Sequence, residues 1–197
     1  MSEYTDLLAA RVRASVEAKQ QLLEGGALDV AAQIATALVT SLGAGGRALW
    51  FGNGGSSMDS GHLAAELLGR FYVDRPPLAS LALADNTAAM TAIGNDYAYE
   101  EVFARQVRGL GRPGDVAIGL TTSGGSNNVV AGLSAAREAG LVTVAFTGSR
   151  GGAVADVAEH VFCAPSDDTP RIQEIHMLVG HTICELVERE LFATAGA

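Results

Sequence analysis

The sequence predicts an α/β protein: a three-layer sandwich whose five-stranded parallel sheet is flanked by helices, with two further helices at the N-terminus. Three observations lead to this prediction. Short apolar segments alternate with amphipathic segments along most of the chain. The apolar segments are continuous rather than alternating with polar residues, as in strands buried on both faces of a parallel sheet. Glycine accounts for 24 of the 197 residues, which suits many tight turns between strands and helices.

Composition narrows the class of protein. Hydrophobic residues make up 48% and charged residues 18%, which excludes a disordered chain, and 197 residues suit one domain. The net charge of −9 argues against a nucleic-acid-binding surface. The N-terminus lacks the apolar core of a secretory signal, and no apolar run is long enough to cross a bilayer. We therefore expect a cytoplasmic protein with neither a nucleic-acid partner nor a membrane.

Two amphipathic segments precede the first strand. Residues 4–23 and 28–42 repeat apolar side chains at helical spacing, and glycines end both segments. Residues 1–46 are therefore expected to form a helical pair. Its apolar faces would pack on the domain or on another subunit.

The rest of the chain alternates strands with helices. Strands are expected at residues 48–51, 78–83, 115–120, 141–146 and 160–163. Helices are expected at residues 57–68, 86–94, 99–110, 127–139, 153–158 and 170–192. Ligands of open parallel sheets bind beyond the carboxyl ends of the strands, so the residues that follow each strand are the candidates for a site.

The first strand runs into a glycine-rich turn and then a helix. The turn consists of Asn53, Gly54, Gly55 and Ser56. Free backbone N–H groups and the positive end of the helix dipole suit an anion or a hydroxyl group at this position. Ser57 occupies the place of the third glycine of the dinucleotide motif, and the lysine of the P-loop is absent. This pattern disfavours a nucleotide and favours a small phosphorylated molecule.

A second loop, after the third strand, is rich in hydroxyl groups. Thr121, Thr122, Ser123 and Ser126 lie around two glycines, directly before a helix. Hydroxyls and backbone N–H groups at a helix N-terminus can surround a phosphate without a cation. Serine and threonine are also common helix caps, which would explain one hydroxyl but not four in six residues. We predict a phosphate site here.

Metal-ligating side chains occur on two helices. His62 and Glu66 are four residues apart and share a helix face, so they could bind a divalent metal or transfer protons. Taken alone, such a pair is more often a solvated surface pair. Gln173 and His181 are eight residues apart on the last helix, about 12 Å along its axis. That span is wide for one metal, so either long side chains or ligands from neighbouring subunits would be needed.

A polar pair follows the apolar turn of the fourth expected helix. Asn95 and Asp96 could contact a ligand. Alternatively, the helix ends at Gly94 and Asn95 caps it. Local sequence leaves the two interpretations even.

Together these segments resemble the sugar isomerase (SIS) domain family, and within it the phosphoheptose isomerases. The resemblance is carried by FGNGGSSMDSGHLAAEL, TAIGNDYAYEEVFARQV, GDVAIGLTTSGGSNNV, TGSRGG and TPRIQEIHMLVGHTICELVE. It covers nearly the whole chain, including the two leading helices. Residues 1–197 are therefore expected to form a single domain of the SIS fold.

The resemblance implies an activity. It implies an aldose–ketose isomerase that converts sedoheptulose 7-phosphate to D-glycero-D-manno-heptose 7-phosphate through a metal-stabilised enediolate, for heptose biosynthesis. It also implies a homotetramer with active sites at subunit interfaces and one Zn²⁺ per site. By position, the zinc ligands would be His62, Glu66, Gln173 and His181. Glu66 and His181 would also be the catalytic proton-transfer pair.

The resemblance further implies the substrate contacts. The phosphate cradle would be Thr121, Thr122, Ser123 and Ser126. The remaining contacts would come from Asn53, Gly54, Gly55, Ser56, Glu66, Asn95, Asp96 and Gln173. Three departures affect substrate details rather than the reaction class: Gly125 replaces a common Asn, Ser57-Met58 a common Ala-Ala, and Pro170 an Asp of some members.

Three alternatives share parts of this pattern. A non-catalytic SIS protein that binds the replication initiator DnaA would match less well at the metal positions, which are all present here. A phosphosugar-sensing regulator usually carries a DNA-binding module, for which this chain has neither a spare segment nor a basic patch. An isomerase of another ketose phosphate would carry the same motifs and stays open.

Overall fold

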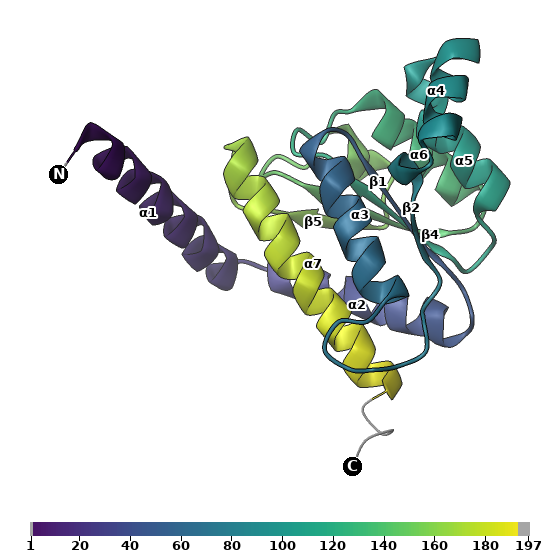
Figure 1. The fold of residues 1–197 in the computed structure, drawn as a ribbon, viewed down its shortest axis with the longest axis horizontal. Coiled ribbons are helices and arrows are strands. Elements are labelled where there is room, and N and C mark those ends of the chain that lie inside the picture. The colour runs from purple at the N-terminus through teal and green to yellow at the C-terminus, as the bar shows by residue number, and fades with distance from the viewer. Residues whose placement is uncertain (1, 193–197) are drawn as a thin grey trace.

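The computed structural model describes residues 2–192; residues 1 and 193–197, the ends of the expected domain, lie outside the described part. Its five strands form one sheet in the order β2-β1-β3-β4-β5, and every neighbouring pair is parallel. Helices cover both faces of this sheet (Figure 1). The predicted three-layer α/β architecture is confirmed.

The elements follow the expected alternation. The strands are β1 Ala48–Gly52, β2 Ser80–Ala82, β3 Val116–Leu120, β4 Val142–Thr147 and β5 His160–Cys163. The α-helices are α1 Glu3–Glu24, α2 Ala27–Gly43, α3 Gly55–Leu68, α4 Thr87–Asp96, α5 Val102–Leu110, α6 Asn127–Glu138 and α7 Thr169–Phe192. Short 3₁₀ helices are η1 Leu83–Asp85, η2 Tyr99–Glu101 and η3 Ala153–Asp156.

Two elements are shorter in the structure than the sequence predicted. The strand expected at residues 78–83 is paired only over Ser80–Ala82, because it lies at the sheet edge and follows two prolines that have no N–H to donate. The helix expected at residues 153–158 is a single 3₁₀ turn. Neither change alters the order of the layers.

The sheet separates two hydrophobic cores. Side chains of β1 alternate between them: Trp50 packs with α2, α3 and α7, whereas Leu49 and Phe51 pack with α5 and α6. All three are fully buried. Figure 1 shows α3 and α7 side by side on one face of the sheet, with α5 and α6 behind the other.

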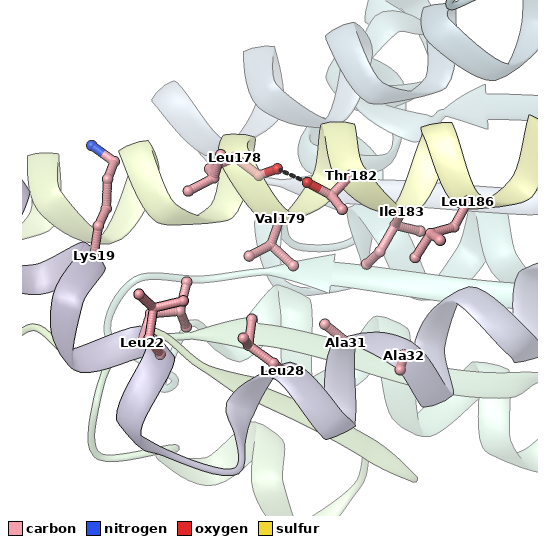
Figure 2. Close-up of a pocket in the computed structure, with 11 residues that line it drawn as sticks. Lys19, Leu22, Leu28, Ala31, Ala32, Leu178, Val179, Thr182, Ile183 and Leu186 are labelled. Atoms are coloured by element: carbon pink, nitrogen blue, oxygen red, sulfur yellow. Dashed lines mark hydrogen bonds between the residues drawn. The ribbon is translucent and has the colours of Figure 1, made fainter.

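Helix α1 extends away from the body of the domain (Figure 1). Only its C-terminal part is buried, at Ala18 and Leu22, and its apolar side chains at Leu8, Val12 and Val16 are exposed. The groove between α1, α2 and α7 is apolar and has a volume of about 450 Å³ (Figure 2). This helix therefore presents an apolar face that the described chain leaves uncovered.

Membrane-spanning potential is low in the described residues. No single helix there combines the length and hydropathy needed to cross a bilayer. The pair α1 and α2 reaches the threshold only when taken together, and it is bent by 76°.

A histidine of α7 belongs to the core rather than to a site. His176 is fully buried beside Phe146 and Phe162. Its Nε2 donates to the carbonyl oxygen of Thr147 at 3.1 Å, while Nδ1 has no partner among the described residues. Burial lowers the pKa of His176 to about 4, although the Thr147 hydrogen bond opposes the shift.

This depressed pKa makes stability depend on pH. Between pH 4 and 6.5 the unfolded state binds a proton at His176 that the folded state excludes, so the free energy of unfolding should rise with pH by about 3 kcal/mol over this range. Urea unfolding at a series of pH values measures the slope. His176→Leu should flatten it; an unchanged slope would show that other groups cause it.

Candidate metal and phosphate site

Helices α3 and α7 lie in parallel register along one face of the sheet. Leu63 is fully buried, and a Cβ added to Gly180 would lie 2.6 Å from its Cδ1 atom. A side chain at position 180 would overlap that of Leu63, so glycine suits this close packing of the two helices. Ser56 contacts Gln173 with the same offset of 117 residues, so the neighbouring positions of the two helices face one another along their length.

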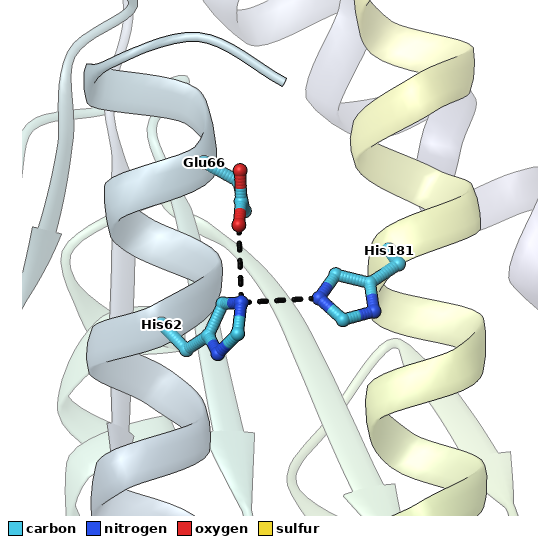
Figure 3. Close-up of side chains that lie close together, drawn as sticks. All are labelled: His62, Glu66 and His181. Carbon is cyan, nitrogen blue, oxygen red and sulfur yellow. Dashed lines mark hydrogen bonds and ion pairs between the residues drawn. The ribbon is translucent and has the colours of Figure 1, made fainter. Parts of the chain in front are cut away.

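This contact brings three ionisable side chains together (Figure 3). His62 Nε2 lies 3.0 Å from Glu66 Oε1 and 3.2 Å from His181 Nε2. One donor atom from each residue lies within 4.8 Å of the others. The His62 side chain is 51% exposed, so the cluster opens to the surface. We call His62, Glu66 and His181 the triad.

The donor set of the triad fits a divalent metal. Two imidazole nitrogens and one carboxylate oxygen are ligands that Zn²⁺ accepts, and catalytic zinc sites commonly use three protein ligands with one position open. The triad comes from two helices of a single chain. Ligands from a neighbouring subunit are therefore not needed for these three positions.

Gln173 does not join the triad within the chain. Its amide nitrogen donates to Ser56 Oγ at 3.5 Å and packs against Gly55, whose added Cβ would lie 2.5 Å from it. Gln173 and His181 are about two turns apart, or about 12 Å along α7. In this conformation the Gln173 side chain contacts the glycine-rich turn, and its role as a fourth metal ligand stays a prediction.

Side-chain hydrogen bonds connect the glycine-rich turn to α6, beyond the carboxyl ends of β1 and β3. Asn53 and Asn128 exchange two amide hydrogen bonds of 2.8 Å each. The Tyr99 hydroxyl donates to Asn53 Oδ1 at 3.0 Å. Asn128 and Tyr99 were not predicted, because their partner lies 75 and 46 residues away and no local pattern marks such pairing.

The hydroxyl-rich loop brings three of its hydroxyl groups together. Thr121 Oγ1 lies 3.0 Å from Ser126 Oγ and 3.4 Å from Ser123 Oγ. Ser126 occupies the N-cap position of α6, but its side chain makes no capping hydrogen bond. This observation weakens the interpretation of the loop as a helix cap. Gly124 has φ +69°, and an added Cβ would lie 1.9 Å from the Gly151 oxygen, so only glycine fits this turn.

Two cavities flank this loop. The larger, about 540 Å³, lies between the two turns and the N-terminus of α6, and is lined by Asn53, Tyr99, Glu100, Gly125, Ser126, Asn127 and Asn128. The smaller, about 270 Å³, is lined by Thr122, Ser123, Gly148, Ser149, Arg150 and Asp167. Both lie at the carboxyl ends of strands, where the sequence placed the site.

Asn95 and Asp96 are not among the residues that line these cavities. Both are exposed, and Asn95 Nδ2 donates to Asp96 Oδ1 at 2.9 Å. Helix α4 continues through Asp96 and has Tyr97 at its C-cap. The expectation that the helix ends at Gly94 with Asn95 as its cap is therefore wrong.

Asp59 is a further polar residue beside the triad. It lies one turn before His62 on α3, and its Oδ2 atom is buried with no partner among the described residues. Burial raises the pKa of the Asp59 carboxyl, and the nearby His62 partly offsets this effect. The three-residue spacing to His62 was a signal from which it could have been found.

Comparison with known proteins decides the family. The SIS domain model matches residues 9–148. The phosphoheptose isomerase of Aquifex aeolicus is 52% identical over 179 residues, covering 89% of this chain and 92% of that protein. The phosphoheptose isomerase of Akkermansia muciniphila is 52% identical over 160 residues, or 81% and 85% of the two chains. The chain belongs to the phosphoheptose isomerase family of SIS-domain proteins.

Solved structures of this family share the fold. The phosphoheptose isomerase GmhA of Neisseria gonorrhoeae aligns with a TM-score of 0.88 at 38% identity, covering 94% of this chain and 98% of its own. A phosphoheptose isomerase of Francisella tularensis aligns with a TM-score of 0.90 at 33% identity, covering 96% and 100%. The resemblance found in the sequence is thereby confirmed along nearly the whole chain.

The approach of α3 to α7 can be tested at Gly180. Gly180→Ala should lower the free energy of unfolding by about 1–3 kcal/mol, because the new methyl group overlaps the buried Leu63 side chain. Gly109→Ala in α5 is the matched control, since no atom lies within 4 Å of its added Cβ. Denaturant unfolding compares the two. Equal effects would contradict close packing at Gly180.

Proposed function

We propose that this chain is an aldose–ketose isomerase that converts sedoheptulose 7-phosphate to D-glycero-D-manno-heptose 7-phosphate, in heptose biosynthesis. The observation that carries the proposal is the convergence of His62, Glu66 and His181 in a chain 52% identical to phosphoheptose isomerases. The triad supplies acid–base groups at one point. The hydroxyl-rich loop supplies a site for the phosphate of such a substrate.

The isomerisation moves two protons. One leaves C1 of the ketose and is delivered to C2 of the aldose, and the hydroxyl proton of O1 passes to O2. We assign the carbon-bound proton to the Glu66 carboxylate and the oxygen-bound proton to the His181 imidazole. These two side chains both neighbour His62 in the structure, so one substrate end can reach both.

A divalent metal, Zn²⁺ in our proposal, would be held by the triad. When bound, it would supply positive charge that stabilises the negative charge developing on the sugar oxygens. His62 is the central residue, because its Nε2 contacts both of the others. Gln173, expected as a fourth ligand, is better supported as a substrate contact beside Gly55 and Ser56.

The phosphate would lie at the other end of the substrate. Thr121, Thr122, Ser123 and Ser126 would bind it together with the backbone N–H groups of α6. Along α3, the glycine-rich turn at Gly55 and the triad residue His62 are about 10 Å apart. The length of α3 between them leaves room for the carbon chain of a sugar alongside the helix. Asn53, Gly54, Asn95 and Asp96 remain proposed sugar contacts.

The site is also proposed to depend on assembly. Residues 1–46 would serve packing between subunits of a homotetramer, since α1 exposes an apolar face and borders an apolar groove. A neighbouring subunit would cover the exposed triad and bring Asn95 and Asp96 toward a sugar. The protein would act in the cytoplasm. Light scattering of the purified protein tests the tetramer.

One assay tests the activity. Sedoheptulose 7-phosphate is incubated with the protein, with and without a chelator, and NMR follows the aldose product. Product that forms only without chelator supports the metal-dependent isomerase. Absence of product, with capture of the replication initiator, would instead favour the non-catalytic SIS protein, and turnover of another ketose phosphate would change the substrate.

Glu66 should be essential for turnover. Glu66→Gln keeps the size and polarity of the side chain but cannot accept the carbon-bound proton, so kcat should fall about 10²–10⁴-fold. Glu138→Gln is the control, because Glu138 is exposed at the far end of α6. Near-normal turnover of Glu66→Gln would remove Glu66 from the mechanism.

Ser126 should contribute to phosphate binding rather than to stability. Ser126→Ala should raise KM about tenfold through loss of one hydrogen bond to a charged group, and lower the unfolding midpoint only slightly, since the side chain caps no helix and loses only its contact with Thr121 Oγ1. Ser134→Ala, further along α6, is the control. Steady-state kinetics and thermal unfolding give both values. A strongly lowered midpoint with an unchanged KM would make Ser126 structural.

A further inference from the structure

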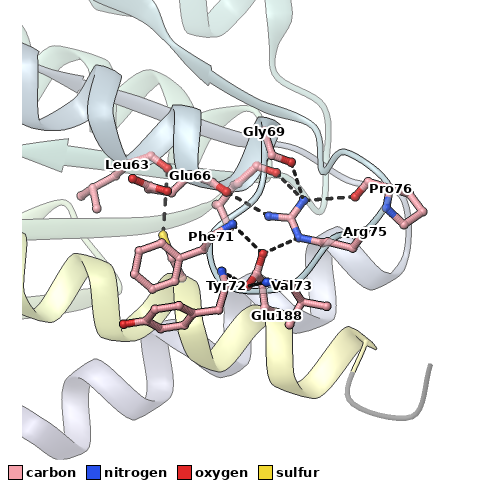
Figure 4. A network of polar contacts seen from close by, with 11 residues as sticks. Leu63, Glu66, Gly69, Phe71, Tyr72, Val73, Arg75, Pro76 and Glu188 are labelled. Atoms are coloured by element: carbon pink, nitrogen blue, oxygen red, sulfur yellow. Dashed lines mark hydrogen bonds and ion pairs between the residues drawn. The ribbon is translucent and has the colours of Figure 1, made fainter. Parts of the chain in front are cut away.

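The segment between α3 and β2 crosses the C-terminal part of α7. Residues 69–76, the first part of this segment, are what we call the strap. Figure 4 shows the strap folded around one carboxylate of α7, that of Glu188. The strap directly follows the part of α3 that carries His62 and Glu66. The sequence analysis assigned it no role.

The Glu188 carboxylate holds the strap through hydrogen bonds. Its carboxylate accepts hydrogen bonds from the backbone N–H groups of Phe71, Tyr72 and Val73, at 2.8, 2.8 and 3.1 Å, and from Arg75 Nε at 2.9 Å. Burial raises the pKa of this carboxyl, but these four hydrogen bonds outweigh it and hold the pKa below its usual value. The carboxylate is therefore charged and fully engaged.

Arg75 connects the same ion pair to α3. Its Nη2 donates to the carbonyl oxygen of Glu66 at 2.9 Å, and its Nη1 donates to that of Leu67 at 2.8 Å. The side chains of Arg75 and Glu188 are each 1% exposed. The guanidinium thus fixes the backbone of a triad residue as well as the strap.

Phe71 connects the strap to the second helix of the triad. Its ring stacks on the His181 imidazole, with centroids 5.7 Å apart and planes inclined by 14°. A stacked ring restricts rotation of the imidazole but leaves the nitrogens at its edge free. His181 Nε2 accordingly faces His62 Nε2 at 3.2 Å.

A buried ion pair seldom adds much stability, because desolvation of two charges offsets their attraction. Arg75 and Glu188 nevertheless use most of their hydrogen-bonding capacity on backbone groups of the strap and of the end of α3, including the carbonyl group of Glu66. We propose that the Arg75–Glu188 pair positions the triad for metal binding, holding the backbone of Glu66 directly and the ring of His181 through Phe71. Arg75, Glu188 and Phe71 are therefore positioning residues, and none of them is a metal ligand.

The proposal rests on the proposed metal site, and Co²⁺ binding tests it without any turnover assay. Phe71→Leu removes the stacked ring but keeps the backbone N–H bonded to Glu188. We expect it to weaken Co²⁺ binding to metal-free protein about tenfold and to alter the Co²⁺ absorption bands at saturation. Thermal unfolding of the metal-free protein should change little.

Three variants complete the comparison. Val73→Ala, the control, shortens an exposed side chain in the same strap, keeps the backbone N–H bonded to Glu188 and should bind Co²⁺ within twofold of wild type. Phe71→Tyr keeps an aromatic ring at this position and should bind Co²⁺ with wild-type affinity. Arg75→Lys keeps the charge but not the forked donors, so it should weaken Co²⁺ binding as well.

The possible results distinguish failure of the positioning role from failure of the metal site. Wild-type affinity and absorption bands in folded Phe71→Leu would overturn the positioning role. If Phe71→Leu does not fold, Phe71→Met, which retains more buried volume, gives the same decision. Wild-type protein that binds no Co²⁺ would instead remove the metal site itself and the mechanism proposed on it.

Discussion

The contact between Gly180 of α7 and Leu63 of α3 is the constraint on which the candidate site depends. A side chain at Gly180 would hold the two helices apart. Each contact residue is the chain neighbour of a triad member, His62 or His181, so core packing directly sets the distance between the two imidazoles. Interiors are close-packed and yield little, which makes this distance a property of the core rather than of the exposed side chains.

Polar groups in the α3–α7 layer divide into three kinds. His176 is buried, neutral and bonded to a backbone carbonyl, as a core residue requires. Arg75 and Glu188 are buried as a charged pair whose remaining capacity is satisfied by backbone groups. His62 is neither, because it is half exposed and its partners are two other ionisable side chains. Burial and partners therefore distinguish a site residue from a structural one where residue type does not.

Much of the fold and part of the site could be predicted. The hydrophobic periodicity of strands and helices is visible in short stretches of sequence. The five strands of the parallel sheet could therefore be predicted from local patterns. His62 and Glu66 meet because residues four apart share a helix face. The pairing of Asn53 with Asn128 and Tyr99 joins separate segments, and no local period encodes it. The short β2 depended on its edge position, which the order of elements alone does not fix.

By itself, the sequence determined the layers, the two helices that carry the candidate ligands and the two loops at the strand ends, since each depends on residues close together in the chain. Only the tertiary structure decided which side chains meet. It placed His181 beside His62, kept Gln173 at the glycine-rich turn, and set Phe71 against His181. The physical reason is register: a helix fixes which side chains share a face, but packing against its neighbour fixes which of them come within bonding distance.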